Sequence, residues 1–67
     1  MQNTLSLNKS QQREINTTLA RLPVLGNDYA ARSLSALYRS ALRDSQKREI
    51  MSIALAYKLV SNQEFII

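Results

Sequence analysis

The chain has 67 residues, enough for one small domain, and its nine Lys and Arg outnumber its five Asp and Glu to give a formal charge of +4. Neither Cys nor His is present, which excludes disulfides and argues against a zinc site. Because a domain of this size buries only about 60% of its unfolded surface, we expect a second subunit to add stability. The positive charge favours an anionic partner, such as nucleic acid, an acidic protein or a lipid surface.

The N-terminal segment carries no recognisable targeting signal. Residues 1–13 lack the continuous apolar core of a secretory signal, which favours a cytoplasmic protein. Within residues 1–8, Leu5 and Leu7 alternate with polar residues, a pattern typical of an extended arm or an edge strand. We therefore expect a short arm before the first helix.

A first helix is predicted over residues 9–22. Asn8 is a suitable N-cap, and Gln11 three positions later completes the pattern of a capping box. The apolar positions of this helix share one face, and they are Ile15, Leu19 and Leu22. Pro23 is expected to end the helix.

A second helix is predicted over residues 28–43, after the turn that contains the only Pro and the only Gly of the chain. Asn27 suits its N-cap, and Asp28 suits the positive end of the helix dipole. At about 100° per residue, one face collects the apolar residues Ala30, Leu34, Leu37, Tyr38 and Ala41. The opposite face collects Arg32, Arg39 and Arg43, so the helix is strongly amphipathic.

A third helix is predicted over residues 46–61. Nothing between Arg43 and Arg48 is a strong helix breaker, so a continuous helix over residues 28–60 is the alternative. In that helix the apolar faces of the two halves would point in opposite directions. A bend near residues 44–46 brings both faces to one core. The prediction is thus an all-α, three-helix domain spanning residues 1–67, with an N-terminal arm and an apolar C-terminal tail.

The third helix has more apolar surface than one core needs. Between residues 50 and 60 only Ser52 and Lys58 are polar, yet this run is about half of the roughly 20 residues that span a bilayer. One stripe, which comprises Ile50, Ile53, Ala54, Tyr57 and Val60, suits the core. A second stripe, on another side of the helix, consists of Met51 and Leu55 with Leu59 beside it. We expect another chain to cover this stripe. With the tail residues included, the predicted interface comprises Met51, Leu55, Leu59, Phe65, Ile66 and Ile67.

Two alternatives concern this interface. The tail of residues 62–67 either extends it or folds back over the core. The third helix could also lie between the other two, which would leave Met51 and Leu55 half exposed, as isolated surface apolar residues often are.

The sequence contains few of the residues that usually carry out catalysis. The commonest general base and the strongest nucleophile, His and Cys, are absent, and the five carboxylates include no pair three or four residues apart. A single Gly cannot form a Gly-rich phosphate loop. We therefore expect a protein that is not an enzyme and needs no cofactor or metal.

The function that these features favour is non-enzymatic. We expect a homo-oligomeric interaction protein that regulates or inhibits a macromolecular partner, acidic protein or nucleic acid, by stoichiometric binding. The predicted contacts to an anionic partner are Arg32, Arg39, Arg43, Lys47 and Arg48.

The alternative is a DNA-binding transcriptional regulator. Over residues 3–43, the order of arm, helix, Gly-containing turn and helix resembles that of ribbon-helix-helix repressors, whose paired arms would enter the major groove. The arm of this chain carries no charge at Gln2, Asn3, Thr4 or Ser6. A helix-turn-helix is the variant of this hypothesis, with Gln46, Lys47 and Arg48 starting the reading helix.

Overall fold

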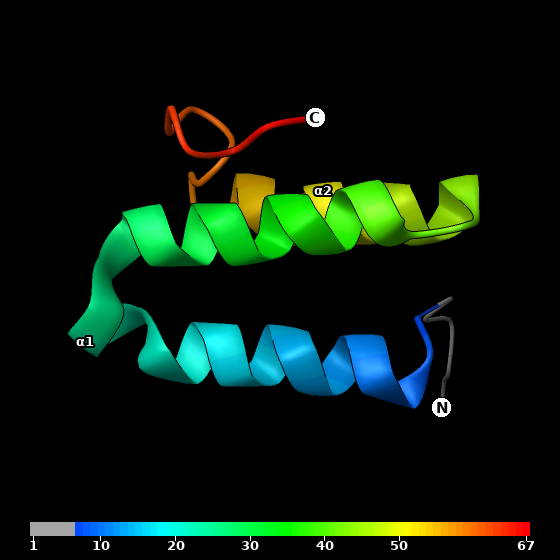
Figure 1. Ribbon diagram of the computed structural model, residues 1–67, viewed down its shortest axis with the longest axis horizontal. Coiled ribbons are helices and arrows are strands. Elements are labelled where there is room, and N and C mark those ends of the chain that lie inside the picture. Colours follow the sequence, from blue (N-terminus) through cyan, green and yellow to red (C-terminus); the bar gives the residue numbers. More distant parts are fainter. Residues whose placement is uncertain (1–6) are drawn as a thin grey trace.

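The computed structural model describes residues 7–67, which fold into two α-helices without a β-strand (Figure 1). These helices are α1 (Lys9–Ser40) and α2 (Asp44–Ala56). The all-α prediction is therefore confirmed, but the count of three separate helices is wrong. The residues predicted as the first two helices belong to one kinked element, α1, whose halves run back along each other. We call residues 9–25 the first arm and residues 27–40 the second arm.

The start of α1 agrees with the sequence prediction. The Gln11 backbone N–H donates to Asn8 Oδ1 at 2.8 Å, and the Asn8 N–H donates to Gln11 Oε1 at 3.0 Å. This reciprocal pair is the predicted capping box, which satisfies two backbone donors that the helix itself leaves unpaired.

The first arm does not end at Pro23, as predicted, but continues to a kink at Gly26. Pro23 lies inside the first arm and has no N–H to donate to the carbonyl four residues back, so the helix lacks one hydrogen bond there. The chain leaves the helical conformation three residues later, at Gly26. Gly26 has φ 88° and ψ 173°, a backbone region that is essentially restricted to glycine. A Cβ at Gly26 would meet no atom within 4 Å, so backbone conformation, not space, selects glycine at the kink.

The boundaries of the later helices also differ from the predicted ones. The second arm ends at Ser40 instead of residue 43, and α2 begins at Asp44 instead of residue 46. Residues 41–43 form the connecting turn, in which the Ala41 N–H donates to the Tyr38 carbonyl at 3.3 Å. The predicted bend between the second and third segments is therefore present, slightly earlier in the chain.

The end of α2 at Ala56, instead of residue 61, has a clear physical cause. Lys58 adopts the left-handed conformation with φ 59°. Its N–H donates to the Leu55 carbonyl at 3.0 Å, and the Leu59 N–H donates to the Ala54 carbonyl at 2.8 Å. These two bonds form a Schellman motif, which terminates the helix. The chain then turns back, and Leu59 enters the core.

The core lies between the two arms and α2. Its buried apolar side chains are Leu7, Ile15, Ala30, Ala31, Leu34, Ala41, Ile50, Ala54, Leu59 and Phe65. The predicted apolar faces of the two arms and the first stripe of α2 all contribute to it. Tyr57 is the exception, because it caps α2 and remains 45% exposed.

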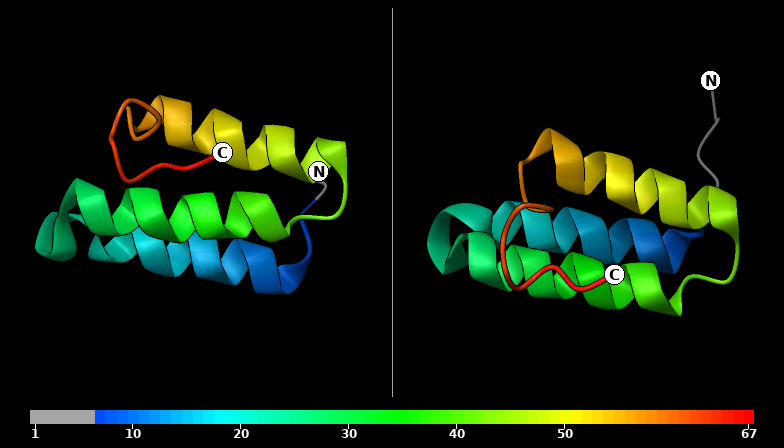
Figure 2. Two further views of the ribbon diagram at one scale, coloured as in Figure 1. Left: turned by 45° about the horizontal axis from the view of Figure 1, so that its top comes forward. Right: turned by 90° about the horizontal axis from the view of Figure 1, so that it is seen from above.

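The C-terminal tail folds back across the second arm (Figure 2). Asn62 Nδ2 donates to Asp28 Oδ1 at 2.8 Å, and Arg32 Nε lies 3.8 Å from Glu64 Oε1. The side chains of Arg32 and Glu64 are largely exposed, so that ion pair contributes at most about 1 kcal/mol. The sequence predicted a short extended segment before the first helix. Its residues 1–6, including Leu5, lie outside the described residues, and Leu7 is buried in the core.

Candidate functional site: an open groove on α2

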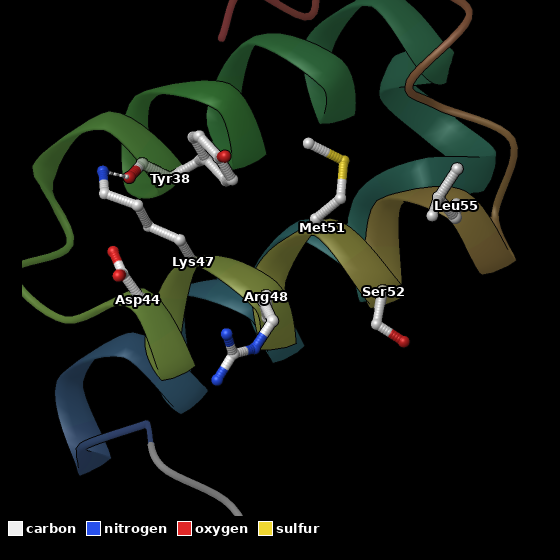
Figure 3. A pocket seen from close by; sticks show the side chains of 7 residues that line it. All are labelled: Tyr38, Asp44, Lys47, Arg48, Met51, Ser52 and Leu55. Atoms are coloured by element: carbon white, nitrogen blue, oxygen red, sulfur yellow. Dashed lines mark hydrogen bonds between the residues drawn. The ribbon is translucent and has the colours of Figure 1, made fainter.

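A groove of about 450 Å³ runs along the surface of α2 (Figure 3). Most of its lining comes from α2, and the opposite wall is the Tyr38 ring from the second arm. The lining residues are Tyr38, Asp44, Lys47, Arg48, Met51, Ser52 and Leu55. From Asp44 to Leu55 the helix rises about 16 Å, so the groove is long enough to hold a short peptide segment. We call it the α2 groove.

The apolar half of the α2 groove consists of Met51 and Leu55. Met51 is half-buried and packs against the core, whereas Leu55 is 60% exposed. The two residues are four positions apart and therefore share one face of α2. A flexible thioether beside an exposed leucine can adapt to apolar side chains of different shapes.

The charged half of the groove is anchored by Lys47. Its ammonium donates to the Tyr38 backbone carbonyl at 2.9 Å and lies 4.9 Å from the centre of the Tyr38 ring. Both contacts fix the position of the charge and join the start of α2 to the end of the second arm. Arg48, in contrast, is exposed, and Asp44 is the carboxylate among the lining residues. The lining thus carries two positive charges and one negative charge.

The structure divides the six residues of the predicted apolar interface. Met51, Leu55, Ile66 and Ile67 reach the surface, and the last two are 56% and 70% exposed. Leu59 and Phe65 lie in the core, at 0% and 8% exposure, which corrects the prediction for these two residues. The Schellman motif turns Leu59 inward, and the Phe65 ring packs edge-on against Tyr38 at 6.3 Å between centroids.

The predicted anion contacts are divided as well. Arg32 pairs with Glu64, and Lys47 is engaged with Tyr38, whereas Arg39, Arg43 and Arg48 are exposed. Within residues 7–67, Arg32 is the arginine that takes part in an ion pair. The exposed Arg43 lies in the turn of residues 41–43, and the exposed Arg39 lies two residues before it. We call this turn, together with Arg39, the basic turn.

The basic turn presents Leu42, a residue that the sequence did not single out. Leu42 is 94% exposed, although its backbone is held in place. Its N–H donates to Gln46 Oε1 at 3.3 Å, and Ala41 beside it is buried at 5% exposure. Because α1 ends at Ser40, a helical wheel drawn through residue 43 could not indicate where Leu42 points.

Gln46 and Lys47, two of the three residues of the expected DNA-reading helix, make contacts within the chain. Gln46 Oε1 accepts from the Leu42 N–H, and it also accepts from Gln11 Nε2 at 3.5 Å. The Lys47 ammonium is bound at the Tyr38 carbonyl. Of the three, only Arg48 is exposed, and Gln46 and Lys47 are half-buried.

The described residues offer little for other chemistry. No group of three or more Asp, Glu, His or Cys side chains comes together there to hold a metal ion. No helix within residues 7–67 has both the length and the apolar character to cross a bilayer. Comparison of the chain with protein-family models, curated proteins and solved structures finds no match. The α2 groove and the basic turn are therefore the candidate binding surfaces.

Proposed function

We propose that this protein is a non-enzymatic, homo-oligomeric interaction protein that regulates or inhibits a macromolecular partner by stoichiometric binding. The observation that carries the proposal is the α2 groove, where Met51 and the exposed Leu55 lie beside Lys47 and Arg48. A non-enzymatic role is part of the proposal, because the chain has neither His nor Cys to act as general base or nucleophile. A cytoplasmic location is also part of it, since a chain without Cys suits a reducing compartment.

The groove supports binding because burial of its apolar residues is favourable. Covering a fully exposed leucine or methionine contributes about 1.5–3 kcal/mol, and Leu55 retains more than half of its exposure. The charges at the other end of the groove add direction, because an occupant gains most when an acidic group lies near Lys47 and Arg48. Apolar contacts then supply affinity, and charge supplies orientation.

The basic turn is the surface that we assign to the anionic partner. Leu42 can act as an apolar anchor, and the flanking Arg39 and Arg43 can pair with carboxylates around the pocket that receives it. A protein partner is favoured over nucleic acid because an exposed leucine between two arginines suits an acidic surface with an apolar pocket. The internal contacts of Gln46 and Lys47 weigh against a helix-turn-helix reading mode.

The proposal is tested by using the immobilised protein to isolate its partner and then titrating that partner in solution. We expect binding to saturate at a fixed molar ratio, with the recovered partner unmodified by mass spectrometry. The Arg39→Glu/Arg43→Glu variant, which reverses the two arginines assigned to the partner, should lose the partner while keeping its helical circular dichroism. As a matched control, Arg13→Glu/Arg21→Glu reverses two exposed charges of the first arm and should retain binding.

Two results would count against the proposal. Covalent change of the partner by substoichiometric amounts of this protein would mean that it is an enzyme. The unaltered protein and both charge-reversal variants could also bind the partner equally well at low salt. That result would mean that Arg39 and Arg43 are only a solvated face.

A further inference from the structure

We propose that the α2 groove of one copy is filled by Ile66 and Ile67 from a second copy, in a reciprocal, two-fold symmetric pair. This inference rests on the homo-oligomer of the proposed function and names its interface. It accounts for two exposed apolar features of one chain, Leu55 in the groove and the pair Ile66 and Ile67 in the tail.

The tail is fixed up to Phe65 and exposed beyond it. Its turns are held by three backbone N–H groups: Asn62 donates to the Leu59 carbonyl at 3.0 Å, Phe65 to the Asn62 carbonyl at 3.0 Å, and Glu64 to Asn62 Oδ1 at 2.9 Å. Phe65 is then buried against Tyr38. Because Phe65 is held in the core, Ile66 and Ile67 follow directly after a buried anchor, and each residue is more than half exposed.

The tail and the groove are neighbours because they share Tyr38. Its ring contacts Phe65 of the tail and also forms one wall of the α2 groove. Figure 2 shows the tail lying along the second arm with α2 next to it. A two-fold axis near Tyr38 would therefore place each tail opposite the groove of the other copy, and every contact would occur twice.

Charge agrees with this pairing. Glu64 is the one charged residue among residues 59–67, and it lies 3.8 Å from Arg32 of its own chain in an exposed ion pair. The α2 groove has a net positive lining, because Lys47 and Arg48 outnumber Asp44. The tail thus combines an acidic residue with two exposed isoleucines, and the groove combines two cations with an exposed leucine. A direct pairing of two α2 helices would cover Leu55 and leave Ile66 and Ile67 open.

Cysteine cross-linking tests the contact directly, because the natural chain contains no Cys. Chains with Leu55→Cys and chains with Ile66→Cys, distinguished by an affinity tag on one of them, are mixed and oxidised. We expect mainly tagged–untagged disulfide dimers, since a disulfide forms only when the two Cα atoms approach to about 4.4–6.8 Å. Val24→Cys replaces Leu55→Cys in the control, because Val24 is exposed at the kink end of the molecule.

Mixing two broken variants provides a second test. The Met51→Glu/Leu55→Glu variant loses its groove and keeps its tail, and the Ile66→Glu/Ile67→Glu variant loses its tail and keeps its groove. Each should be monomeric alone. The mixture retains one intact tail–groove contact per pair, so it should dimerise at least about tenfold more tightly than either variant alone, as measured by analytical ultracentrifugation.

The outcomes separate this inference from the proposed function. A monomeric natural protein would refute both the homo-oligomer and the reciprocal pair. A dimer that cross-links as Leu55→Cys with itself, or that is not restored by mixing, would refute the tail–groove contact and leave the homo-oligomer standing. An intrachain disulfide in a monomeric Leu55→Cys/Ile66→Cys double variant would mean that the tail fills its own groove, which also refutes the inference.

Discussion

The two sides of α2 are built from similar apolar residues but have opposite surroundings. On the inner side, Ile50 and Ala54 are both at 0% exposure. On the outer side, Met51 is half-buried and Leu55 is 60% exposed. Hydrophobicity alone therefore does not distinguish a core residue from a surface residue. The distinction comes from which elements lie opposite, since the arms of α1 cover the inner side and no described element covers Leu55.

The largest expected effect concerns the inner side. Ile50→Ala should lower the free energy of unfolding by about 2–5 kcal/mol, because it removes buried methylene groups and leaves a cavity among closely packed neighbours. Leu55→Ala is the matched change on the outer side and should alter the stability of the monomer by less than about 0.5 kcal/mol. Urea denaturation at low protein concentration measures both.

If Ile50→Ala does not fold, Ile50→Val keeps the comparison measurable. Its expected cost is about 0.5–1.5 kcal/mol. Equal losses from Ile50→Val and Leu55→Ala would mean that the outer side is also packed within the monomer, and the comparison between the two sides would fail.

A second prediction adds volume instead of removing it. Ala54→Leu should destabilise the fold by about 1–3 kcal/mol, because the inner side has no room for three more carbon atoms. Ala56→Leu, two residues further along the same helix, points to solvent and should be tolerated. Thermal unfolding followed by circular dichroism compares them, and a stabilised Ala54→Leu variant would reveal an unfilled space in the core.

Part of this architecture could be predicted from the sequence. The capping box at Asn8 and the apolar faces of the two arms depend on residues a few positions apart, so local patterns are sufficient to identify them. The bend before α2 followed from helical phase. The surplus apolar side of α2 was also visible in the sequence, although two of the six residues assigned to the interface, Leu59 and Phe65, lie in the core.

The missed features depend on contacts that a local pattern does not encode. The left-handed position that ends α2 is occupied by Lys58, whereas the usual signal at this position is Gly or Asn. The helix was therefore predicted too long, and Leu59 was assigned to the surface. Phe65 is buried by Tyr38, 27 residues earlier in the chain, and no spacing in the sequence indicates that meeting.

A third prediction concerns the boundary between the two sides. Lys47→Met keeps most of the aliphatic stem but removes the hydrogen bond to the Tyr38 carbonyl and the contact with its ring. We expect a loss of about 1 kcal/mol in unfolding free energy. Arg48→Met removes the adjacent, exposed cation and should leave stability unchanged. Identical results for the two variants would mean that the Lys47 contacts do not stabilise the fold.

The smallest effect on the monomer, and the most informative one for the outer side, is expected from Leu55→Lys. The side chain is already mostly exposed, so a lysine can extend into water with little change in the thermal midpoint of dilute protein. Association stabilises the folded state by mass action, and the midpoint of an oligomer therefore rises with protein concentration. We expect that rise for the natural chain and not for Leu55→Lys, in differential scanning calorimetry over a hundredfold range of concentration. Val24→Lys, a change at the exposed kink, should keep the rise, because the kink has no part in the proposed interface. A concentration dependence that survives Leu55→Lys but disappears with Val24→Lys would place the self-association at the kink end and leave the outer side of α2 without its proposed role.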